Sequence, residues 1–137
     1  MKTSARNQLK GTISSIKSGQ VNSEVVIDLK SNVVKAVLTN EAVEEMELAV
    51  GQEVYAIIKA SFVIVSKEKP EQISTRNVFE TTVTDVKKGL VNSTLKLAMG
   101  DDTLSANITN EATEELEIAE GDTLYALVKA SSIILAK

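Results

Sequence analysis

Five residues with side chains suited to anion binding occur twice in the 137-residue chain, 70 positions apart. Arginine offers a planar fork of donors, lysine a compact positive charge and serine a neutral hydroxyl donor. With backbone amides near Ala5 or Ala60, such groups could surround a tetrahedral dianion. Because the donors are N–H and O–H groups, no site for a bare metal cation is predicted. The residues are Ser4, Arg6, Asn7, Lys59 and Ser61, with counterparts Ser74, Arg76, Asn77, Lys129 and Ser131.

The same residues also have a structural interpretation. Arginine and lysine at domain edges are usually solvated, and serine at a strand end usually satisfies a turn. Their repetition does not separate the two interpretations, since residues that determine a fold also survive a duplication. Residue types and spacing alone therefore leave both open.

The chain is an internal duplication. Ser4–Lys67 aligns without a gap on Ser74–Lys137, and 26 of the 64 aligned pairs are identical. Most other apolar pairs exchange Val, Ile, Leu and Met, which conserves the volume of a packed core. We predict a first domain over residues 1–67, a charged linker over 68–72 that holds the only proline, and a second domain over 73–137.

Each repeat reads as a small, mainly β domain with one short helix. Thr39 or Asn40 can cap the helix N-terminus, and Gly51 is expected to end it. Four or five short strands with a helix late in the order fit an OB-like β-barrel, so we predict two in tandem; a compact β-sandwich is the alternative. The predicted strands of the first repeat are Gly11–Gly19, Glu24–Leu29, Val33–Leu38, Glu53–Lys59 and Phe62–Val65.

Composition excludes several kinds of chemistry. Cysteine and histidine are absent, which removes thiolate metal sites and the usual general base. A net charge of −4 and a pI of about 4.9 disfavour nucleic-acid and anionic-membrane surfaces, but not a local basic pocket. With no apolar stretch of membrane-spanning length and no leader pattern, we expect a cytoplasmic protein.

Two other function classes receive little support. Lys59 and Ser61 share a strand face but lack a third orienting group, so we predict that the chain is not an enzyme. Single-strand binders combine a basic groove with stacking aromatic residues. This chain has 2 Phe, 2 Tyr and no Trp, so an OB-like nucleic-acid-binding protein is a distant alternative.

The motif order closely resembles the Mop domain, the molybdate-binding repeat of the molbindins. The resemblance rests on SARNQLKGTISSIKSGQVNSEV from Ser4, on LTNEAVEEMEL, on IIKAS ending at Ser61, and on their repetition, as in a di-Mop molbindin. It implies an OB-like fold, a homotrimer, and molybdate or tungstate bound between domains and subunits. The implied site residues are Ser4, Ala5, Arg6, Lys59, Ala60 and Ser61, with Ser74, Thr75, Arg76, Lys129, Ala130 and Ser131 in the second copy.

The resemblance also implies a second kind of anion site near the threefold axis. Weaker candidates for it are two equivalent loops, contributing Gly19, Val21, Asn22 and Ser23, and Gly89, Val91, Asn92 and Ser93. Two departures bear on affinity: Thr75 replaces an alanine, and Ala42 and Ala112 stand where many relatives carry serine. The two copies therefore need not bind equally.

The function expected from the sequence is binding, storage and homeostasis of molybdate or tungstate inside the cell, without an organic cofactor. The alternative is an oxyanion-sensing module that acts through a separate regulator or transporter. In that case, we expect the DNA-binding or ATPase domain on another polypeptide.

Overall fold

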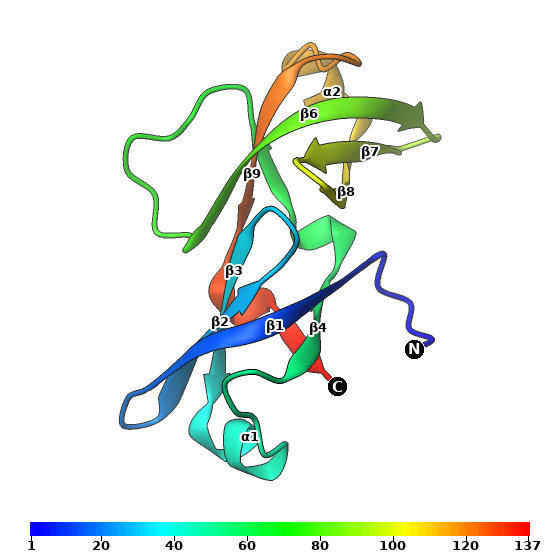
Figure 1. Ribbon diagram of the computed structural model, residues 1–137. Helices are drawn as coiled ribbons and strands as arrows, with labels where there is room; N and C mark the ends of the chain where they lie inside the picture. The colour runs from blue at the N-terminus through cyan, green and yellow to red at the C-terminus, as the bar shows by residue number, and fades with distance from the viewer.

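The computed structural model describes residues Met1–Lys137 as two five-stranded antiparallel sheets stacked end to end (Figure 1). The mainly β, OB-like prediction is confirmed, with one short α-helix in each half. The first repeat holds β1 (Asn7–Ser18), β2 (Asn22–Asp28), β3 (Val33–Thr39), β4 (Glu53–Ile58) and β5 (Ile64–Ser66). The second holds β6 (Asn77–Lys88), β7 (Asn92–Met99), β8 (Asp102–Thr109), β9 (Thr123–Val128) and β10 (Ile134–Ala136).

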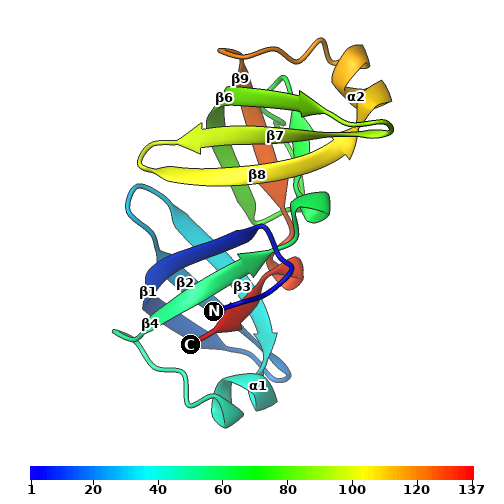
Figure 2. The same ribbon diagram turned by 90° about the vertical axis from the view of Figure 1, so that its right-hand side faces the viewer.

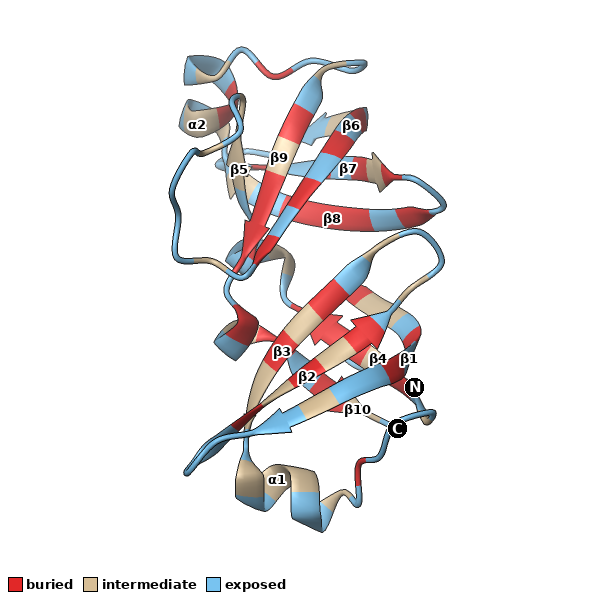
Figure 3. Cartoon of the chain, turned by 60° about the vertical axis from the view of Figure 1, so that its left-hand side comes forward, coloured by how far each residue is buried: buried red, intermediate tan, exposed pale blue.

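Each sheet buries one face, as the alternation of side chains along its strands requires (Figure 3). In β7, Ser93, Leu95 and Leu97 are buried, whereas Thr94 and Lys96 between them are exposed. The outer faces of the strands therefore remain available to solvent or to a ligand.

The helices begin where predicted but end earlier. The Thr39 side chain caps α1 (Asn40–Glu45) by accepting a hydrogen bond from the Ala42 N–H at 3.1 Å. The prediction that the helix reaches Gly51 was wrong, because Glu47 adopts a left-handed φ of 52° and breaks the helical repeat. Gly51, with φ 95°, lies in the turn before β4. The second helix, α2 (Asn110–Glu115), has the same cap from Thr109.

The two repeats exchange their last strands. The first sheet has the order β10-β4-β1-β2-β3 and the second β5-β9-β6-β7-β8. Figure 2 shows the C-terminal strand, in red, lying against β4 of the other repeat. Two short 3₁₀ helices, η1 (Ala60–Phe62) and η2 (Ala130–Ser132), precede these strands and pack on β8 and β3 of the opposite repeat. Residues that follow Lys59 therefore lie beside the second domain.

A polar clamp joins the domains on one side. The Asp102 carboxylate accepts hydrogen bonds from the Ser31 N–H at 2.9 Å and from the Asn32 side-chain amide at 2.8 Å. The same amide donates to the Met99 carbonyl at 2.6 Å. Because Asp102 is buried, these partners replace the water that its charge has lost. The clamp therefore helps to fix the orientation of the first domain relative to the second.

An ion pair holds the end of β5 on the second domain. Lys67 Nζ lies 3.0 Å from Asp122 Oδ2. The Ala119 backbone N–H and Lys67 lower the pKa of the Asp122 carboxyl below its ordinary value of 3.8. The stability from this group is therefore present above pH 3.8 and is lost as the pH falls through the lower folded-state pKa.

Asp122→Asn is expected to lower the melting temperature slightly at neutral pH, because it removes the charge that Lys67 and the Ala119 N–H favour. The difference from the unmodified chain should disappear as the pH falls below the folded-state pKa of the Asp122 carboxyl. Thermal melts at a series of pH values from neutral to strongly acidic measure this difference in melting temperature. A difference that stayed constant over that range would contradict the assignment.

None of the helices is both long enough and apolar enough to span a membrane.

Candidate oxyanion pocket between the repeats

A cavity of about 230 Å³ opens between the N-terminal segment, the start of η1 and the outer face of β8. Six of its seven lining residues belong to the set predicted from the sequence, and the seventh comes from the second repeat. They are Ser4, Ala5, Arg6, Lys59, Ala60, Ser61 and Asn107.

Strand pairing brings the two halves of the motif together. β1 and β4 are antiparallel, with Asn7 opposite Ile58. Arg6, just before β1, therefore lies beside Lys59, just after β4, although the two are far apart in sequence. A repeat that places SAR before one strand and KAS after its partner must produce this juxtaposition once the strands pair.

The pocket is locally positive within an acidic chain. It contains two cations and no carboxylate, and neither Arg6 nor Lys59 takes part in an ion pair. Lys59 Nζ lies 5.1 Å from the centroid of the Phe62 ring, a cation–π distance that restrains its side chain. Two unpaired cations with the hydroxyls of Ser4 and Ser61 can bind a small dianion by charge-assisted hydrogen bonds.

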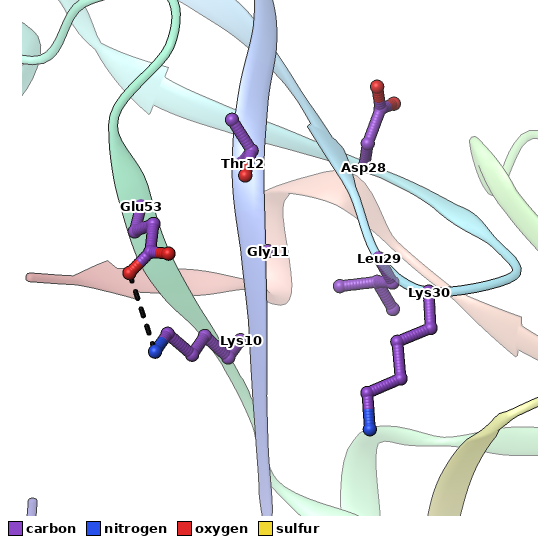
Figure 4. Close-up of a pocket in the computed structure, with 7 residues that line it drawn as sticks. All are labelled: Lys10, Gly11, Thr12, Asp28, Leu29, Lys30 and Glu53. Atoms are coloured by element: carbon purple, nitrogen blue, oxygen red, sulfur yellow. Dashed lines mark ion pairs between the residues drawn. The ribbon is translucent and has the colours of Figure 1, made fainter.

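A second cavity of similar size carries no net charge in its lining (Figure 4). It measures about 250 Å³ and includes Lys10, Lys30, Asp28 and Glu53 in its lining. Glu53 lies 3.3 Å from Lys10, and Asp28 adds an unpaired carboxylate. Because its two carboxylates offset its two lysines, this cavity is a poor site for a dianion.

The predicted asparagines do not line the pocket. Asn7 is only 3% exposed, and its side-chain amide donates to the Ile58 and Ser105 carbonyls at 3.1 and 2.9 Å. Its oxygen accepts from the Ser105 N–H at 2.7 Å. Asn77, 2% exposed, bonds in the same way to Lys35 and Val128. Each amide thus bonds one carbonyl of its own repeat and the N–H and C=O of one residue of the opposite repeat, which gives it a role in joining the domains.

The second copy of the motif is arranged similarly but encloses no cavity. The pairing of Asn77 with Val128 places Arg76 beside Lys129, as in the first copy. Position 37, the counterpart of Asn107, is valine, and Ala130 is only 5% exposed. The Thr75 hydroxyl is buried without a hydrogen-bond partner. Ser74 and Ser131 are exposed nearby.

Thr75→Val is expected to raise the melting temperature of the ligand-free protein, because it replaces an unsatisfied buried hydroxyl with a methyl group of the same shape. The gain should be about 1 kcal/mol in the free energy of unfolding, since an orphaned polar group costs about 1–3 kcal/mol. Thermal and urea denaturation measure it, with Thr84→Val as the control because the exposed Thr84 hydroxyl bonds Lys96 O at 3.2 Å. A loss of stability would show that the Thr75 hydroxyl has a partner in solution.

The weaker loop candidates lie at the hairpin tips and line no cavity. The Gly19 N–H donates to the Asn22 carbonyl at 2.8 Å, and Gly89 bonds Asn92 likewise at 2.7 Å. Ser23 and Ser93 are buried and donate to the Asn40 and Asn110 side chains. Val21 and Val91 are exposed. These loops fasten each helix N-terminus to its hairpin.

Sequence reasoning missed Asn107. Its counterpart in the other repeat is Val37, so a search restricted to residues shared by both repeats discards it. The usable signal was the alternation in β8, which places polar Ser105 and Asn107 on one face.

Comparison with known proteins supports the resemblance. A family model described as the TOBE domain matches residues 3–65 and 73–135. The molybdenum transport protein ModE of Azotobacter vinelandii is 37% identical over 138 residues, covering 99% of this chain and 51% of its own. The molybdenum-pterin-binding protein MopA of Rhodobacter capsulatus is 39% identical over 139 residues, covering 99% and 52%. The chain thus spans about half the length of these two relatives.

A solved structure is similar over its whole length. The cytoplasmic molybdate-binding protein ModG, in a form with molybdate bound, superimposes with a TM-score of 0.94 at 38% identity, covering 99% of both chains. Both repeats match the family model and the tandem arrangement matches ModG, so the chain belongs to the TOBE-domain family, as a tandem pair of the Mop, or molbindin, type.

Proposed function

We propose that this chain binds molybdate or tungstate reversibly in the pocket of Arg6 and Lys59, and that it stores and buffers the oxyanion without chemical turnover. The observation that carries the proposal is the lining of that pocket, which has two unpaired cations, two serines and no carboxylate. The similarity to ModG, whose structure contains molybdate, supports the choice of anion.

Binding would exchange the hydration shell of the anion for preorganised donors. Arg6 and Lys59 lie side by side with like charges, so the ligand-free pocket carries a repulsion that a dianion relieves. Ligand is therefore expected to stabilise the folded chain by mass action, by about 2.7 kcal/mol at a ligand concentration 100 times the Kd.

The proposal includes assembly and location. We place the protein in the cytoplasm, as its relative ModG is described, and we infer a homotrimer in which further anion sites form between subunits. A homotrimer would also bury apolar side chains that a single chain leaves exposed, among them Leu90 and Val91 on one hairpin.

The test is calorimetric titration of anion-free protein with molybdate, tungstate and sulfate, together with thermal melts and light scattering. Binding of the first two at three-chain mass, with a raised melting temperature, supports the proposal. Sulfate has the same charge but a smaller radius, so it reports whether the pocket selects by size. No heat and no change in melting temperature with any of the three anions would overturn the proposal.

A further inference from the structure

A larger cleft of about 620 Å³ adjoins the oxyanion pocket. It shares Arg6, Ala60 and Asn107 with that pocket. Its remaining lining comes from the outer face of the second sheet, through Lys87 of β6, Thr94 and Lys96 of β7, and Ser105 of β8. The segment from the first repeat thus forms one wall, and the second domain forms the floor.

The strand register arranges these side chains in two rows. Lys87 lies opposite Thr94, and Thr94 lies opposite Asn107. In the neighbouring row, Lys96 lies opposite Ser105. The rows are two residues apart along the strands, roughly 7 Å. Donors therefore cover an area wider than a single tetrahedral oxyanion.

The cleft is cationic and contains no carboxylate. Arg6, Lys87 and Lys96 take part in no ion pair. Asp85 lies opposite Lys96 in the register of β6 and β7, but it makes no ion pair with Lys96 and lies outside the lining of the cleft. Three unpaired cations facing one space favour a ligand with several negative charges.

The cleft contains no aromatic side chain, and Ala60 is its single apolar residue. It therefore offers no surface on which a base or another flat ring could stack. Its volume lies within the range of roughly 300–1,000 Å³ typical of small-molecule sites, whereas the 230 Å³ oxyanion pocket lies below that range. Size, polarity and charge together indicate a compact polyanion.

We propose that this cleft binds an anion with two linked tetrahedral oxyanion groups, of the diphosphate class. One group is bound by Lys87 and Thr94 with Asn107, and the other by Lys96 and Ser105, with Arg6 between this site and the oxyanion pocket. The site is separate from the proposed molybdate site, and it shares with it Arg6, Ala60 and Asn107.

The first repeat supplies a matched control. At the positions equivalent to Thr94, Lys96 and Asn107 it has Glu24, Val26 and Val37, and no cleft is present there. Lys17 is the counterpart of Lys87, and it too lies on the outer face of its sheet. Lys17→Ala therefore removes the same charge from the same kind of strand, away from the cleft.

The experiment is calorimetric titration of the full chain with inorganic pyrophosphate, in a buffer free of phosphate. We expect one binding event per chain, weakened about tenfold or more by Lys87→Ala and by Lys96→Ala. Lys17→Ala should leave it unchanged, and both cleft variants should bind molybdate as the unmodified chain does. Orthophosphate should bind at least tenfold more weakly than pyrophosphate, since it can reach only one row.

Three outcomes would overturn the proposal: no heat with pyrophosphate, equal weakening by Lys17→Ala, or loss of pyrophosphate binding in Lys59→Ala with no effect of Lys96→Ala. The last would place pyrophosphate in the oxyanion pocket. Failure of molybdate to bind would contradict the proposed function but leave this test intact, because Lys87 and Lys96 do not line the oxyanion pocket.

Discussion

Lys59→Ala is expected to weaken molybdate binding in the Arg6–Lys59 pocket by about 10- to 150-fold. The variant removes one of two cations that would make charge-assisted hydrogen bonds to the anion, and such a bond contributes about 1.5–3 kcal/mol. The fold should persist, because Lys59 is exposed and its ammonium group takes part in no ion pair. Calorimetric titration measures the affinity, and circular dichroism checks the fold.

Lys10→Ala is the matched control, since Lys10 lines the cavity with Asp28 and Glu53. It changes the net charge equally but should leave molybdate affinity unchanged. Lys129→Ala reports on the second copy, where we expect a smaller effect because no cavity has formed around Arg76 and Lys129. If Lys10→Ala weakened binding as much as Lys59→Ala, net charge rather than the pocket would be responsible.

Asn7→Ala is expected to destabilise the protein by about 3–5 kcal/mol. It removes three hydrogen bonds and leaves the Ser105 N–H and C=O buried without those partners. Each orphaned group costs about 1–3 kcal/mol. For a chain of this size, the melting temperature should fall by roughly 10–17 °C. Because the two bonds to Ser105 cross from the first repeat to the second, the loss should loosen the contact between the domains.

Gln8→Ala is the control for this variant. Its side chain bonds Thr3 Oγ1 at 2.9 Å near the surface, so the change in unfolding free energy should stay within about 0.5 kcal/mol. Asn77→Ala should reproduce the Asn7→Ala loss, because Asn77 makes the equivalent bonds to Lys35. Urea denaturation of all three variants measures the change in the free energy of unfolding. An Asn7→Ala variant as stable as Gln8→Ala would refute the joining role of this amide.

Much of the molecule could be predicted from its sequence. The duplication, the approximate positions of the strands and the Thr39 and Thr109 caps follow from local patterns, because alternation and capping depend on residues close together in the chain. The strand predicted from Gly11 begins at Asn7, and Phe62, predicted to begin a strand, ends η1 instead. Five residues that line the candidate pocket could be named because both copies repeat them, and Ala5 was named with them although Thr75 replaces it in the second copy. The antiparallel pairing of β1 with β4 then brings the residues before Asn7 next to the residues after Ile58.

Tertiary structure alone decided the exchange of β5 and β10, because a three-residue strand shows which face is apolar but not which sheet edge it joins. That exchange carries η1 to β8, which brings Asn107 into the pocket and opens the cationic cleft beside it. The role of Asn7 was undecidable from sequence for a related reason. A side-chain amide can bond an anion or a backbone equally well, and its surroundings determine which.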